Sequence, residues 1–403
     1  MGTLDSDRAA KSGENDLGDK ALFTPKFFLL SFFSFVTFYT AFQLYPTMPF
    51  RILALQGSEG QAGLFLGLLT FASAWSAPFG GAITDRLGQR HILMTSSTVF
   101  FLCSFIFFYA RSLWIILPLA VVFGVFWSAL LAASFALMTD IIPAERRAEG
   151  IGYWGVAGIF AIVVSPLSGL EIYNAYGWHW LCGGVAFLSL VLLTIAFILK
   201  DKPHAHPSGR TLRGFFSEGF FERRVFVISI SLFLYSFGYG GVTSFVALYA
   251  RDSGTHPIGL FFLVFAGTMV LARPATGRVA DRLGRRRIFL PSLALIGMAL
   301  ILLSISGSFW NLVASAVIYG LGFGSAYPVF AAMVLDRIDS HRHGAAYGSI
   351  LLAFDTGIGS GSILTGIFIQ HFGYHMAFGV TAGVAMFAIP YYLMAERKLQ
   401  GQW

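Results

Sequence analysis

The sequence predicts an all-α integral membrane protein with twelve transmembrane helices, arranged as two pseudo-symmetric six-helix bundles. Three observations lead to this fold class. Hydrophobic residues make up 56% of the 403 residues, and the mean hydropathy is +0.71. The apolar residues fall into twelve runs of spanning length, and the two halves of the chain repeat each other at a fixed offset. Soluble chains contain about 45–50% apolar residues, so the expected solvent is lipid.

The twelve runs each approach the length needed to cross a bilayer, which is about 20 apolar residues in a helix. Breaks rich in charge, Gly or Pro separate them. The first six expected spans are 26–50, 62–84, 91–110, 114–138, 149–171 and 178–199. The second six are 223–250, 257–280, 288–306, 309–335, 345–369 and 374–395. An even number of spans places both termini on one side.

The spans divide the chain into five expected segments. These are an N-terminal tail (1–25), an N-terminal six-helix half (26–199), a linker (200–222), a C-terminal six-helix half (223–395) and a C-terminal tail (396–403). The linker contains Phe215, Phe216, Phe220 and Phe221. These rings indicate either a helix lying on the membrane surface or a linker that packs against the helix ends.

The positive charges indicate the orientation. Of the 27 Lys and Arg, 23 fall on the side of the termini, and only Arg51, Arg111 and Arg251 fall on the other. Cytoplasmic loops carry the excess of positive charge, so both tails are expected in the cytoplasm. The same distribution explains the net charge of +7 without nucleic acid. Short loops without N-x-S/T sequons are typical of a bacterial inner membrane.

The internal repeat is the most specific signal. GAITDRLGQR starts at Gly81 and GRVADRLGRR at Gly277, 196 residues later. The same offset relates Asp140 to Asp336, and it needs no gap over about 130 residues. Agreement at Asp, Arg and Pro in one register is not expected by chance. Parallel repeats related by an axis along the membrane normal are known from transporters.

The repeated motif resembles the loop between spans two and three of the major facilitator superfamily, Gly-x-x-x-Asp-Arg-x-Gly-Arg-Arg/Lys. Both copies stand in that loop of their half, and the resemblance covers about 26–395. It implies a secondary transporter that works by rocking two halves around a midplane site. It also implies a chain that acts as a monomer, without a cofactor.

In that family the loop latches the two halves in the outward-open state, with a carboxylate at the end of span four completing the network. The resemblance assigns the latch to Gly81, Asp85, Arg86, Gly88, Arg90, Asp140, Gly277, Asp281, Arg282, Gly284, Arg285 and Asp336. The alternative is that these charges only fix the topology.

Two further family signatures are partial. The antiporter motif of span five, Gly-Pro-x-x-Gly, is SPLSG here, which keeps Pro166 and Gly169 and replaces the first glycine by Ser165. Pro166 is expected to kink this span. The arginine that multidrug antiporters carry in span four is replaced by Ala120, so its proton-relay role has no counterpart.

Two charges lie deep in expected spans, where charge is costly and marks function by default. Asp355 in span eleven is about 15 Å from the cytoplasmic end, and Arg273 in span eight is at a similar depth. Their repeat equivalents, Ile159 and Ala77, are both uncharged. One interpretation is a structural Arg273–Asp355 ion pair. The other is a proton- or substrate-coupling site at Asp355, with its protonation set by burial and by Arg273.

The substrate cavity is expected between the halves. FQLYPTMP (42–49) and GYGGV (238–242) occupy corresponding places in spans one and seven and are expected to interrupt both helices. In the family, spans one, four, seven and ten face the cavity. Its expected lining is Gln43, Tyr45, Trp127, Tyr235, Tyr239, Thr243 and Tyr327. Many rings and few charges favour lipophilic or amphipathic compounds over sugars.

These features together predict a proton-coupled exporter of small lipophilic or amphipathic molecules. Proton-symport uptake of a small organic solute is the alternative, followed by a non-transporting receptor on the same fold. All nine His lie at span ends or in loops, so neither a metal site nor an embedded enzyme is expected. The expected partners are the small molecule, protons and the lipid bilayer, but no nucleic acid.

Overall fold

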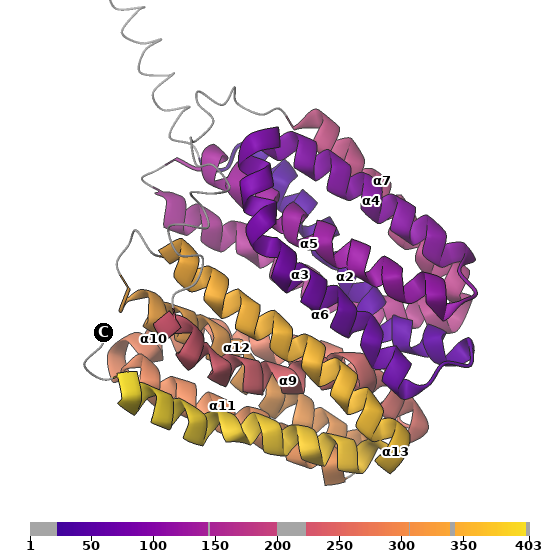
Figure 1. Cartoon of the computed structure of the whole chain (residues 1–403), viewed down its shortest axis with the longest axis vertical. Coiled ribbons are helices and arrows are strands. Elements are labelled where there is room, and N and C mark those ends of the chain that lie inside the picture. The colour runs from indigo at the N-terminus through magenta and orange to yellow at the C-terminus, as the bar shows by residue number, and fades with distance from the viewer. Residues whose placement is uncertain (1–21, 144–145, 200–222, 306, 339–342, 400–403) are drawn as a thin grey trace, which may run out of the picture.

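The computed structural model describes residues 22–143, 146–199, 223–305, 307–338 and 343–399, and these are helical almost throughout (Figure 1). The linker expected at 200–222 and most of the N-terminal tail lie outside the described residues, and so does the surface helix considered for the linker.

The N-terminal half contains six long helices. They are α2 (Pro25–Ala54), α3 (Glu59–Leu87), α4 (Gln89–Tyr109), α5 (Leu113–Ile141), α6 (Arg147–Tyr176) and α7 (Trp178–Ile198). Each overlaps one expected span, with ends that differ by a few residues. In Figure 1 these indigo to magenta helices lie together on one side of the molecule.

The C-terminal half follows the same order. Its helices are α9 (Arg223–Asp252), α10 (Leu260–Leu283), α11 (Arg285–Ile305), α12 (Phe309–Leu335) and α13 (His343–Leu399). Gly373, with φ 77° and ψ 174°, divides α13 into two helices, which cover the last two expected spans. Among the described residues, nine helices are long and apolar enough to cross a membrane. The fold is therefore that of an all-α, multi-pass membrane protein.

The repeat is visible in the backbone. Gly88 and Gly284 have φ of 86° and 92° where α3 and α10 end, and Gly177 and Gly373 have φ of 87° and 77°. Each pair is separated by the 196-residue offset. A side chain is strained at such a φ, so glycine permits the sharp turn between consecutive helices.

The repeat also governs packing. A Cβ added at Gly124 in α5 would lie 2.1 Å from the Leu69 carbonyl oxygen of α3, and one added at Gly320 in α12 would lie 2.5 Å from the Phe265 oxygen of α10. The two glycines are 196 residues apart in the sequence, and so are the two residues whose carbonyl oxygens they would meet. Small residues let helix backbones approach in the same way in both halves.

Two expectations are corrected. α2 and α9 are uninterrupted helices through FQLYPTMP and GYGGV. The glycines of α9 instead allow close packing, since a Cβ on Gly240 would lie 1.9 Å from the Ile358 oxygen of α13. In addition, α13 continues to Leu399, so the tail expected from residue 396 begins as helix. Glu396 is buried there at 6% exposure.

Candidate site between the two halves

The halves meet along α3 and the first part of α13. Ser362 Oγ donates a hydrogen bond to the Gly63 carbonyl oxygen at 2.9 Å. Further along, a Cβ on Gly359 would lie 2.7 Å from Thr70 Oγ1. The contact continues to Ser73, whose Oγ is 3.4 Å from Asp355 Oδ2. We call the end where α3 finishes at Leu87 the basic end, and the end where it starts at Glu59 the opposite end.

Beyond Asp355 the two halves separate toward the basic end. Gly348 precedes Asp355 by seven residues, which places both on one face of α13. Within the described part of the chain, a Cβ added at Gly348 would nevertheless have no atom within 4 Å. The contact between α6 and the start of α10 also joins the halves, and it too stops before the basic end. Leu167 of α6 packs on Gly259, the residue just before α10, whereas Val156, on the same face of α6, is 58% exposed. The described contacts thus close the opposite end and leave the basic end open.

Asp355 lies at the boundary where the contact stops. Its one hydrogen bond among the described residues comes from Ser73, which belongs to the other half. Tyr45 of α2 and Tyr327 of α12 are within electrostatic range of its carboxyl group. The side chain remains partly exposed. A carboxyl group held by one long hydrogen bond, between two halves, can gain or lose a proton when the halves move.

Arg273 does not form the expected ion pair. In the described part of the chain, the ion pairs within 4 Å do not include Arg273 with Asp355. Its Nε is buried without a hydrogen-bond partner, and its electrostatic neighbours are Tyr235 and Tyr327. Tyr327 is therefore near both charges. Among the described residues, the ion pair that depth alone suggested is therefore absent in this conformation.

An aromatic cluster of α9, α12 and α13 surrounds these charges. The ring centroids of Tyr239 and Phe323 are 4.4 Å apart and stacked. Phe354 lies 5.0 Å from Tyr327 and 6.0 Å from Tyr235. We define the aromatic cluster as these five residues. Tyr239, Tyr327 and Phe354 are only partly buried, although they lie well inside long helices of the bundle. Three of the expected lining residues are thus brought together.

The N-terminal half contributes a smaller aromatic group. Phe42 lies 4.7 Å from Tyr45, and Phe38 lies 5.3 Å from Trp127 in an edge-to-face arrangement. Tyr45 is within electrostatic range of Asp355 and Tyr239, which both belong to the other half. The remaining lining candidates, Gln43 and Thr243, are buried in α2 and α9.

The SPLSG motif lies beside this site. α6 runs as one helix through Pro166. A Cβ on Gly169 would lie 3.0 Å from Cα of Gln43 in α2. In the structure the glycine of the motif therefore serves the close approach of α6 and α2.

The expected latch residues form contacts within each half. Gln89 Nε2 donates to Asp140 Oδ2 at 2.7 Å, and Arg285 Nη1 pairs with Asp336 Oδ2 at the position 196 residues later. Arg90 donates to the Phe197 carbonyl oxygen at 2.6 Å. The first half therefore uses a neutral amide where the second uses a guanidinium.

The remaining latch residues are less informative. Gly88 and Gly284 form the tight turns described above, and Arg86 and Arg282 are exposed near the ends of α3 and α10. The side-chain surroundings of the other four lie outside the described residues, namely Gly81, Asp85, Gly277 and Asp281. Whether the loops hold the halves together stays a prediction.

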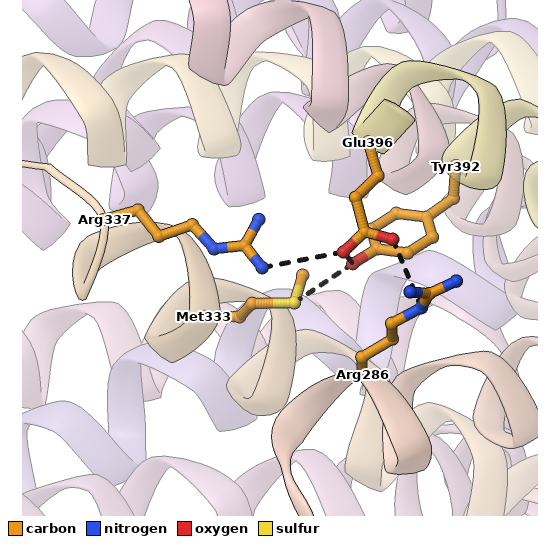
Figure 2. Close-up of polar contacts among 5 residues, drawn as sticks. All are labelled: Arg286, Met333, Arg337, Tyr392 and Glu396. Carbon is orange, nitrogen blue, oxygen red and sulfur yellow. Dashed lines mark hydrogen bonds and ion pairs between the residues drawn. The ribbon is translucent and has the colours of Figure 1, made fainter. Parts of the chain in front are cut away.

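A second charged cluster was not expected from the sequence (Figure 2). The Glu396 carboxylate is 3.2 Å from Arg286 Nε and 3.6 Å from Arg337 Nη2. The Tyr392 hydroxyl donates to Glu396 at 3.1 Å and also lies 3.2 Å from the Met333 sulfur. This cluster joins α11, α12 and α13 at the basic end. Tyr392 and Glu396 are four residues apart, the spacing at which side chains meet on one face of a helix. This spacing could have extended the expected last helix beyond residue 395.

The sequence profile described as Major Facilitator Superfamily matches residues 27–256 and 228–402, nearly all of the chain. The chain belongs to this superfamily. Members of the superfamily are transporters. The protein is therefore a membrane transporter of small molecules and not an enzyme. The match confirms the family that the repeated loop motif resembled.

Relatives and solved structures agree with this assignment. The multidrug resistance protein MdtG of Proteus mirabilis is 22% identical over 84% of this chain and 86% of its own length. MdtG of Salmonella typhi is 22% identical over 81% of this chain and 83% of its own. The chain is thus similar to members of the superfamily that are named multidrug resistance proteins.

The solved structures share the fold at lower identity. The nucleoside transporter NupG aligns with a TM-score of 0.75 at 16% identity, over 92% of this chain and 99% of that one. A POT family transporter in complex with 5-aminolevulinic acid aligns with a TM-score of 0.79 at 13% identity, over 94% and 98%. The bacterial homologue of Spinster, in its inward-facing and occupied conformation, gives 0.74 at 14%, over 92% and 96%.

Proposed function

We propose that the protein is a proton-coupled exporter of small lipophilic or amphipathic compounds in a bacterial inner membrane, with both termini in the cytoplasm. The observation that carries the proposal is the place of Asp355. Its carboxyl group lies beside the aromatic cluster, and its hydrogen bond comes from Ser73 of the other half. The names of the MdtG relatives support export of drug-like compounds.

The open basic end faces the cytoplasm if the positive-inside rule sets the orientation. In this conformation a compound enters from the cytoplasm or the inner leaflet and rests on the aromatic cluster. Rocking of the halves closes the basic end and separates α3 from α13 at the opposite end. The Ser73–Asp355 contact then breaks, and the carboxyl group faces outward.

Exchange follows from this alternation. Asp355 takes up a proton from the outer side as the compound leaves. The return to the present conformation restores the contact with Ser73 and releases the proton to the cytoplasm. One compound moves out and at least one proton moves in, so the proton gradient drives export.

The test measures how much of a cationic lipophilic dye, an anionic lipophilic dye and a neutral amphiphile accumulates in cells that express the protein. We expect lower accumulation than in control cells, and a return to the control level after a protonophore is added. Asp355→Asn should abolish the export while the protein stays folded. Glu171→Gln, at an exposed carboxyl near the opposite end, is the matched control and should export normally.

Three outcomes would contradict the proposal. Unchanged accumulation across the panel would favour proton-symport uptake of a small metabolite, and ligand binding without flux would favour a receptor. Export that persists in Asp355→Asn would remove the coupling role from this carboxyl group, and another titratable group would have to take it.

A further inference from the structure

Arg273 is a cation near the middle of α10 that has no counter-ion among the described residues. It lies ten residues before the end of α10 at Leu283, or about 15 Å along the helix. None of the ion pairs found among the described residues includes it. Its neighbour Asp281, whose side chain is outside the described residues, is two turns away toward the basic end. A buried charge without a partner is costly, so one that persists calls for an explanation.

The groups around Arg273 do not neutralise it. Its electrostatic neighbours are the hydroxyl groups of Tyr235 and Tyr327. The Tyr235 hydroxyl is itself buried without a hydrogen-bond partner, and so is that of Tyr319 in α12. Buried polar groups are normally hydrogen-bonded. This part of the site therefore has hydroxyl groups with unused hydrogen-bonding capacity, and no described carboxylate pairs with the guanidinium.

The repeat indicates that the fold does not need the arginine. Ala77 stands at the equivalent position of α3. Two turns away from these positions the helix pairs pack alike, through Gly124 on Leu69 in one half and Gly320 on Phe265 in the other. Arg273 is not part of this shared packing, and we therefore look for its role in the site.

The aromatic cluster completes the chemistry of the site. Tyr235 and Tyr327 belong to it, and both contact Phe354. A ligand on these rings would present an apolar or aromatic body to them and any acidic group to the guanidinium. Planar guanidinium groups bind carboxylates through paired hydrogen bonds.

We propose that Arg273 binds the acidic group of the transported compound, so that the substrates are aromatic organic anions of the carboxylate type. This rests on the proposed function only in taking the aromatic cluster as the transport site. Asp355 remains available for the proton, because it does not pair with Arg273.

The test compares fluorescein with rhodamine 123, which share a xanthene–phenyl skeleton but carry opposite charges. Fluorescein methyl ester, which lacks only the free carboxylate, is the third probe. Binding is measured by fluorescence anisotropy on the full chain in nanodiscs, without a proton gradient. The variants are Arg273→Ala and Arg273→Lys. Arg287→Ala, which removes an exposed arginine at the basic end, is the control for charge.

We expect the unmodified protein to bind fluorescein at least tenfold more tightly than the ester or rhodamine 123. Arg273→Ala should lose this preference, Arg273→Lys should keep part of it, and Arg287→Ala should keep all of it. Equal binding of the three probes, or a preference that survives Arg273→Ala, would overturn the inference. If Arg273→Ala does not fold, the lysine variant decides, because it keeps the charge and loses the paired hydrogen bonds.

The assay separates this inference from the proposed function. Arginine-dependent binding of fluorescein without proton-driven export would uphold the anion site and reject the exporter. Proton-driven export of rhodamine 123, together with equal binding of fluorescein and the other two probes, would uphold the exporter and reject the anion site.

Discussion

At the scale of single residues, Glu396 is the clearest case of a charge whose role is structural. Its side chain is 7% exposed and is satisfied by Arg286, Arg337 and the Tyr392 hydroxyl (Figure 2). Removing one partner of such a network leaves the others unsatisfied, and that penalty exceeds the loss of the pair itself.

Glu396→Gln is therefore expected to destabilise the protein by about 1–3 kcal/mol. The measurement is thermal unfolding of the purified chain in detergent. Glu149→Gln is the matched control, since Glu149 pairs with Arg146 at the surface, where both side chains are well exposed. It should leave the unfolding temperature unchanged. Equal effects of the two variants would contradict the structural role of Glu396.

The sequence predicted which residues carry unusual charge, but not their partners. Depth in an apolar run was enough to single out Asp355 and Arg273. Ser73, which bonds to Asp355, lies 282 residues away along the chain, and no local pattern points to it. Opposite charge and similar depth suggested the Arg273–Asp355 pair wrongly, because depth along a helix says nothing about the direction in which a side chain points.

At the scale of helices, small residues determine how closely neighbours pack. Without water in the bilayer there is little hydrophobic drive between helices, and close backbone contact takes its place. Gly124 and Gly320 provide such contacts at equivalent places in the two halves.

Gly124→Ala and Gly320→Ala are each expected to lower stability by about 2 kcal/mol, because the added methyl group meets a backbone oxygen. Gly183→Ala in α7 is the control. Its Cβ would have open space, and it should be neutral or slightly stabilising. Thermal unfolding in detergent measures all three. A neutral result for both buried positions would mean that the helices can shift apart without penalty.

Helix positions were predictable to within a few residues, since apolar length sets them. The expected breaks in α2 and α9 were wrong for a physical reason. Gly and Pro weaken an isolated helix, but neighbouring helices in a membrane restore the backbone bonds and exploit the missing side chains. The glycines of GYGGV serve the contact with α13, which is a property of the pair and not of α9 alone.

At the scale of the whole molecule, the repeat creates two bodies that can move against each other. They touch from Glu59 to Ser73 on α3 and separate beyond Asp355 on α13. In the orientation that we propose from the positive charges, the open end faces the cytoplasm.

This orientation makes a prediction for labelling by a membrane-impermeant maleimide. Arg111→Cys should react in intact cells, whereas Arg287→Cys should react only after permeabilisation; both positions are exposed, at opposite ends. The natural Cys103 and Cys182 are buried, so the background should be low. The reverse pattern would invert the topology, and the direction of transport with it.

The most direct test of the account is to lock the closed end. Gly67 and Gly359 face each other across the contact between the halves, since a Cβ on Gly67 would lie 3.2 Å from the Gly359 oxygen and one on Gly359 would lie 3.1 Å from the Gly67 oxygen. The side chains of Ile363 and Thr70 have to shift to admit the two cysteines. The double variant Gly67→Cys/Gly359→Cys is compared with each single variant as a control. We would measure the flux of an exported dye into inside-out proteoliposomes with an acidic lumen, before and after oxidation. Rocking of the halves predicts that oxidation stops the flux and that a reductant restores it. Undiminished flux through a fully cross-linked protein would contradict alternating access between these two halves.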